Sequence, residues 1–101
     1  MAYNIRPAIE EELNKISMSN NRFFDSHYII KRLLEKHTND YFSYIASIAP
    51  ENETKNANNI HGLLAQEIGK CTSLVSDTGN DISTENIKGE LSPCRVWEKI
   101  K

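Results

Sequence analysis

A short amphipathic segment near the middle of the chain carries side chains that could read a nucleic acid. Residues 60–68 hold four apolar side chains at helical spacing: Ile60, Leu63, Leu64 and Ile68. The opposite face would present His61, Gln66 and Lys70. A glutamine can pair with an adenine edge, and a helix N-terminus with a nearby histidine can meet a phosphate. Because Lys70 is offset by Glu67, the same side chains also fit an ordinary surface helix.

Basic residues gather in two further places in the sequence. They are Lys31, Arg32, Lys36 and His37, and at the C-terminal end Arg95, Lys99 and Lys101. If the two segments pack together, they would form one positive patch able to contact phosphates. A charge cluster of this size is also typical of a solvated surface. The residues expected to contact a nucleic acid are therefore His61, Gln66, Lys70, Lys31, Arg32, Lys36 and Arg95.

Histidines and cysteines are the residues that could bind a metal ion. They are His27, His37, His61, Cys71 and Cys94. Structural zinc sites usually use closely spaced Cys and His pairs, which this sequence lacks. We therefore expect no metal ion and no other cofactor, with His27 bonded to backbone or to Asp25 and Cys94 buried as a small apolar side chain.

The sequence also contains residues that could be combined into a catalytic nucleophile and a histidine base. Cys71 can be combined with His61 and Asp25, and Ser26 with His27. Such sets occur in most chains, because a catalytic triad is recognised by its geometry and not by sequence order. The sequence has no nucleophile elbow, glycine-rich phosphate loop or paired-histidine metal motif. We do not expect an enzyme.

Aromatic side chains favour a different function, the binding of another protein. The chain has more of them than a small core needs: Phe23, Phe24, Tyr28, Tyr41, Phe42, Tyr44 and Trp97. Tyrosine and tryptophan are enriched in protein interfaces, although several of these residues also fit the core. An exposed subset, such as Tyr28 with Phe42, would indicate a surface for a partner or for a second copy of the chain.

Length and composition indicate a single domain over residues 1–101. The chain is 39% apolar and 26% charged, which is an ordinary globular composition. Its net charge of −2 disfavours a strongly basic nucleic-acid binder and a polybasic membrane binder. The sequence has neither a secretory signal at its start nor an apolar run of membrane-spanning length, so we expect a cytoplasmic protein that does not contact membranes.

Four helices are expected to position the candidate residues. Their starts are Pro7, then Asp25 or Ser26, then Thr38–Asp40, and finally Asn58 or Asn59. The first three carry apolar stripes formed by Ile5, Ile9, Leu13 and Ile16, by Ile29, Ile30, Leu33 and Leu34, and by Tyr41, Tyr44, Ile45 and Ile48. A polar internal loop over residues 51–59 would separate the third helix, which ends before Pro50, from the fourth.

A two-stranded hairpin is expected after the fourth helix. Cys71–Ser76 and Ile82–Ile87 would be its strands, joined by a turn at Asp77–Asn80. Ser92-Pro93 would then open a short helical turn that docks Trp97 on the body of the domain. Helices followed by a hairpin is the order of a winged helix. The predicted fold is therefore an α+β, helix-rich domain with four helices and a C-terminal two-stranded hairpin, similar to a winged helix.

Three motifs resemble a set of small, uncharacterised bacterial proteins. They are Phe24-Asp25-Ser26-His27, Ile60-His61-Gly62, and Ser83-x-x-Asn86-Ile87-x-Gly89-x-x-Ser92-x-Cys94-x-x-Trp97-x-Lys99. The similarity spans residues 23 to 99 and implies a bacterial domain family, to which no activity, ligand or site residue is attached.

Two functions are left open by the sequence. The leading hypothesis is a small cytoplasmic, bacterial nucleic-acid-binding or transcription-regulatory accessory protein of winged-helix type, with DNA as its partner. The alternative is a protein–protein interaction module, either a homodimer or the partner of another protein, that does not bind nucleic acid.

Overall fold

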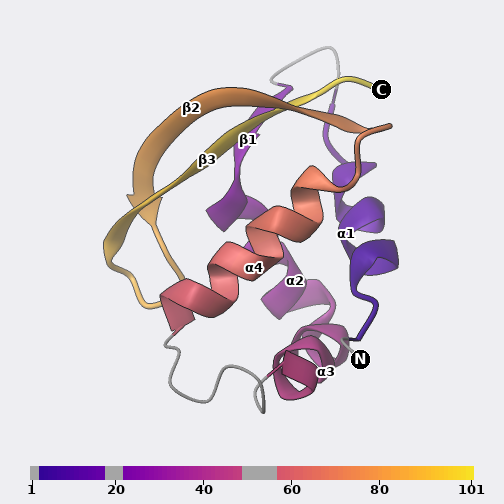
Figure 1. Ribbon diagram of the computed structural model, residues 1–101, viewed down its shortest axis with the longest axis vertical. Helices are drawn as coiled ribbons and strands as arrows, with labels where there is room; N and C mark the ends of the chain where they lie inside the picture. The colour runs from indigo at the N-terminus through magenta and orange to yellow at the C-terminus, as the bar shows by residue number, and fades with distance from the viewer. Residues whose placement is uncertain (1–2, 18–21, 49–56) are drawn as a thin grey trace.

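The computed structural model describes residues 3–17, 22–48 and 57–101, and for residues 57–60 the backbone alone (Figure 1). The elements in chain order are α1 (Arg6–Leu13), β1 (Phe23–Asp25), α2 (Ser26–Lys36), α3 (Thr38–Ile48), α4 (Ala57–Gly69), β2 (Val75–Glu85) and β3 (Leu91–Lys99). These residues form an α+β domain with four helices and a three-stranded antiparallel sheet. Every helix in the described part of the chain is too short or too polar to cross a lipid bilayer.

The apolar stripes of the helices meet in one core, as the sequence predicts. The side chains that are essentially inaccessible to solvent are Ile5, Ile9, Leu13, Ile29, Ile30, Leu33, Leu64 and Ile68. Tyr41, Tyr44 and Ile48 of α3 are also buried. Partly buried residues pack around this centre and complete the predicted stripes: Ile16, Leu34, Ile45 and Leu63. The side chain of Ile60 lies outside the described part.

The predicted helix starts are confirmed for α2 and differ by a few residues elsewhere. The Oδ1 of Asp25 accepts the Tyr28 N–H at 2.8 Å and so caps α2. The first helix begins one residue before Pro7. The fourth begins at Ala57, so residues 57–59 are helical and were wrongly placed in a loop. Residues 51–56 of that loop lie outside the described part.

The sheet has three strands where the sequence predicts two. Its order is β1–β3–β2, and both pairs are antiparallel. Phe23–Asp25 was expected only to precede a helix, but it pairs with β3 so that Phe24 lies opposite Trp97. A three-residue strand is too short to show alternation in sequence, and this pairing depends on residues more than 70 positions away.

The predicted turn at Asp77–Asn80 is a bulge inside β2. The register moves from Asp77 opposite Trp97 to Asp81 opposite Arg95, so extra residues are accommodated on β2. Gly79 has φ +78°, and its N–H donates to Asp77 Oδ1 at 2.8 Å. The turn chemistry is therefore real, but it bends the strand without reversing it.

The chain reverses instead at residues 86–90. Asn86 is buried, and its Oδ1 accepts the N–H groups of Lys88 and Glu90 at 2.9 and 3.1 Å. Gly89 has φ +81°, which favours glycine. The predicted helical turn at Ser92-Pro93 is wrong, because this segment is part of β3. A single strand, β2, runs from Val75 to Glu85 where the sequence predicts two strands, Cys71–Ser76 and Ile82–Ile87, and β3 occupies the place of the predicted final turn.

Candidate functional site

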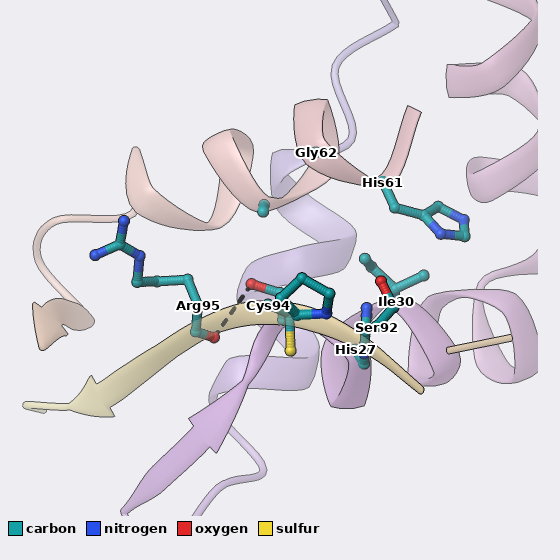
Figure 2. A pocket seen from close by; sticks show the side chains of 10 residues that line it. His27, Ile30, His61, Gly62, Ser92, Cys94 and Arg95 are labelled. Carbon is teal, nitrogen blue, oxygen red and sulfur yellow. Dashed lines mark hydrogen bonds between the residues drawn. The ribbon is translucent and has the colours of Figure 1, made fainter. Parts of the chain in front are cut away.

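A hollow of about 310 Å³ lies where α2, α4 and β3 meet (Figure 2). Ser26 and His27 line it from α2, and His61 lines it from α4. The β3 wall includes Cys94 and Arg95, beyond the end of β1. Three chemistry-bearing side chains that are far apart in sequence, His27, His61 and Arg95, thus border one space.

His61 is buried and joins α4 to α3. Its Nε2 lies 2.8 Å from the hydroxyl of Tyr41. Burial raises the pKa of Tyr41, so the hydroxyl stays protonated and forms a neutral hydrogen bond with the ring. Burial also lowers the pKa of His61, and the nearby His27 and Lys88 lower it further. The ring is therefore neutral at pH 7, and the nitrogen bonded to Tyr41 cannot serve a phosphate.

Arg32 and Arg95, two of the predicted basic contacts, are held by acidic side chains. Arg32 Nε lies 2.8 Å from Oε1 of Glu12, whose side chain is 1% exposed. Arg95 lies 3.3 Å from Asp77 and 3.1 Å from Asp81. The Arg32 pair faces α1 and is fixed by the buried acid. The Arg95 pairs are half-exposed, where such bonds contribute little and are easily exchanged.

The outer face of α4 carries Gly62 and Gln66, and Lys70 follows the last residue of the helix; all three are exposed and lie at four-residue spacing. Lys70 lies 3.0 Å from Glu67 in an ion pair whose lysine is exposed and whose glutamate is mostly buried. Gln66 also borders a second hollow, of about 440 Å³, together with Arg95. Of the residues that the sequence predicts for the outer face of this helix, Gln66 and Lys70 are exposed, whereas His61 is buried against Tyr41 and Gly62 takes its place on that face.

The predicted lysines of α2 lie apart from that stripe. Lys31 is half-buried and lines a smaller hollow with Asp25, His27 and Glu85. Lys36 is exposed in the last turn of α2. The seven predicted residues therefore do not form one patch. His61 and Arg95 line one hollow between α4 and β3, Gln66 and Arg95 line another, and Arg32 faces α1.

Lys88 is a candidate contact that the sequence pattern does not indicate. Lys88 is exposed at the reversal between β2 and β3. That reversal lies beside the first half of α4 (Figure 1), and Lys88 is close enough to His61 to lower its pKa. The signal in the sequence is Gly89, which marks a turn at the end of the strand predicted over residues 82–87.

Exposed aromatic side chains lie beside β1 and, separately, on α3. Tyr28 and Phe23 are 47% and 48% exposed, and Phe42 on α3 is 56% exposed. Phe23 and Tyr28 border a hollow of about 350 Å³ that also includes Ile16 and Phe24. Tyr28 and Phe42 are thus the exposed subset that the protein-binding alternative anticipates.

Of the scattered histidines and cysteines, the structure brings His27 and Cys94 together. With Asp25 they offer ligand atoms that all lie within 4.8 Å of one another. Cys71 is buried at the end of α4, burial raises the pKa of its thiol, and its Sγ lies 3.7 Å from the Glu67 carbonyl oxygen. Cys71, His61 and Asp25, which the sequence allows as a catalytic triad, each hydrogen-bond to a different partner and not to one another.

The chain matches no protein-family model, no curated protein and no solved structure. The resemblance to small bacterial proteins stays a prediction.

Proposed function

We propose that the domain binds nucleic acid in the manner of a winged helix, with α4 as the helix that meets a groove and the 86–90 reversal as the wing. The observation that supports this most is the position of the reversal beside the first half of α4, where recognition helices carry their base contacts (Figure 1). The exposed Gly62 and Gln66 lie on the same helix, and the exposed Lys70 follows its last residue.

The chemistry of this face fits weak, salt-sensitive binding. Gln66 supplies an amide for a base edge, and a Cβ at Gly62 would meet no atom within 4 Å, so a groove can approach the helix closely. Lys70 and Lys88 supply phosphate contacts. With these two contacts, the logarithm of the binding constant should fall with the logarithm of salt concentration with a slope of about −2.

A mobility-shift assay with duplex DNA across a salt series tests the proposal. Lys88→Ala and Gln66→Ala should each weaken binding, and Lys88→Ala should also reduce the salt slope by about 1. Lys101→Ala is the matched control, because Lys101 is an exposed lysine at the opposite end of β3 from the reversal. The proposal fails if the protein does not retard DNA at low salt, or if Lys88→Ala and Lys101→Ala bind alike.

A second candidate function is self-association through the aromatic surface formed by Phe23 and Tyr28. Their exposure beside a hollow favours it, since large exposed aromatics are typical of interfaces. Light scattering during size exclusion should show a mass that rises toward a dimer with concentration, and Tyr28→Ser should abolish the rise. Phe42→Ser is the control, because Phe42 lies on α3, away from that hollow. A constant monomer mass would contradict this candidate.

A further inference from the structure

The pairing of β1 with β3 brings three potential metal ligands together. Asp25 lies opposite Val96 in the antiparallel register. His27 follows two residues later in the first turn of α2, and Cys94 lies two residues before Val96 on β3. The ligand atoms of Asp25, His27 and Cys94 accordingly all lie within 4.8 Å of one another. The two sides of the cluster are 67 positions apart in sequence, which is why spacing alone gave no metal prediction.

Thr84 holds two of these side chains in place. Its hydroxyl lies 2.9 Å from His27 Nδ1 and 3.4 Å from Cys94 Sγ. Thr84 is on β2, so a residue from each side of β3 contributes to the arrangement. Cys94 and Trp97 point to opposite faces of β3, because side chains alternate along a strand. Figure 2 shows the Cys94 sulfur pointing away from α4, toward the side of His27.

The ligand types and their geometry point to zinc. A thiolate, an imidazole and a carboxylate are the ligands that Zn²⁺ prefers, with bonds of about 2.0–2.3 Å that put ligand atoms roughly 3–4 Å apart. The three ligand atoms lie at most 4.8 Å from one another, so small side-chain rotations would bring them to the separations of a zinc site. Asp25 can cap α2 through Oδ1 and still offer its second oxygen. We propose that Asp25, His27 and Cys94 bind one zinc ion.

The surroundings leave room for a fourth ligand. A hollow of about 190 Å³ is bordered by Asp25, His27, Thr84 and Glu85, and a water molecule there would complete a tetrahedral set. Lys31 borders the same hollow and opposes a cation, whereas Glu85 favours one. On binding, the Cys94 thiol releases its proton to solvent, and the ion joins β3 to the start of α2.

Cobalt(II) titration of the untagged, reduced protein tests the site, because cobalt replaces zinc and reports a thiolate ligand by a near-ultraviolet charge-transfer band. The band should saturate at one cobalt per chain and disappear when one equivalent of zinc is added. Cys94→Ser should abolish it. Cys71→Ala, which removes the other thiol, should leave it unchanged.

Two further variants test the nitrogen and oxygen ligands. Asp25→Asn keeps a side chain that caps helices well, so it removes the carboxylate with little effect on folding. Asp25→Asn and His27→Gln should each weaken zinc binding at least tenfold in a competition titration with a chromophoric chelator, while circular dichroism shows the fold retained. The proposal is overturned if no stoichiometric band forms, if the band survives in Cys94→Ser, or if both variants that keep the fold bind zinc as tightly as the unaltered protein.

Discussion

The indole Nε1–H of Trp97 donates a hydrogen bond to Ser26 Oγ at 2.9 Å, across 71 positions of sequence. Trp97 lies on β3 and Ser26 is the first residue of α2, and both side chains are buried. An indole N–H can only donate, so its burial requires an acceptor. This bond therefore fixes the sheet to α2 at the point where β1 becomes helix.

Removing that acceptor should destabilise the domain. Ser26→Ala leaves the buried Trp97 N–H without its partner, and we expect a loss of about 1–3 kcal/mol in the free energy of unfolding. Urea denaturation followed by tryptophan fluorescence measures it. Ser43→Ala, on the exposed face of α3, should change stability by less than about 0.5 kcal/mol. Equal stability of the two variants would show that the bond contributes nothing.

Glu12 should make stability depend on pH in the acid range. Burial by itself raises the pKa of this carboxyl, but hydrogen bonds from Lys15, Arg32 and His37 outweigh it and lower the pKa from 4.5 to about 2. A carboxyl whose pKa is lower in the folded state stabilises the fold above pH 4.5. That contribution is lost as the pH falls from 4.5 to 2, because the unfolded chain takes up the proton first.

The size of this effect follows from a comparison with Glu12→Gln. Allowing for solvent screening at the half-exposed Lys15, the carboxylate should contribute about 2 kcal/mol near pH 7. Urea denaturation of both proteins between pH 7 and pH 2 should show a stability difference that shrinks steadily below pH 4.5. A difference that stays constant over this range would contradict the lowered pKa.

Arg32 should matter for folding more than for nucleic-acid binding. Its guanidinium is one of the groups that neutralise the buried Glu12, so Arg32→Ala leaves that charge with fewer partners. We expect Arg32→Ala to lower the thermal unfolding midpoint clearly more than Lys31→Ala does. In the mobility-shift assay, at temperatures where both variants are folded, Arg32→Ala should bind DNA as the unaltered protein does. Weaker DNA binding by Arg32→Ala without a loss of stability would indicate that Arg32 contacts DNA directly.

Local patterns in the sequence predict the helical half of the fold well. The four-residue spacing of Ile5, Ile9 and Leu13 identifies the buried face of α1, and the cap at Asp25 is recognised from its own neighbours. Both features depend on interactions within a few residues. They are therefore visible to reasoning from propensity and periodicity.

The sheet and the candidate sites depend on contacts that local patterns do not contain. Gly79 has real turn chemistry, but Thr78 donates its hydroxyl to the Val96 carbonyl at 2.8 Å and keeps this segment in the sheet as a bulge. Likewise, the approach of His27 to Cys94 follows from the pairing of β1 with β3. The bulge at Gly79 and the approach of His27 to Cys94 share one cause. Each is decided by the adjacent strand of the sheet and not by residues nearby in sequence.

The two glycines of α4 should respond oppositely to a methyl group. At Gly62 a Cβ meets no atom within 4 Å, and alanine is the better helix former by about 0.5–1 kcal/mol, so Gly62→Ala should stabilise the domain by about that amount. At Gly69 a Cβ would lie 3.0 Å from Cη2 and 3.5 Å from Cζ3 of Trp97. The buried indole is held by Ser26 and cannot retreat freely, so Gly69→Ala should destabilise by about 1–3 kcal/mol.

A double variant tests whether the clash at Gly69 acts through the Trp97–Ser26 bond. If the added methyl group pushes the indole away from Ser26, then Ser26→Ala has already lost part of what the clash would cost. The combined variant should therefore lose less stability in urea than the sum of the two single losses, by about 0.5 kcal/mol or more. Strict additivity would mean that the indole tolerates the methyl group without moving from its acceptor. A neutral or stabilising Gly69→Ala would contradict the close packing of α4 on β3 at this position.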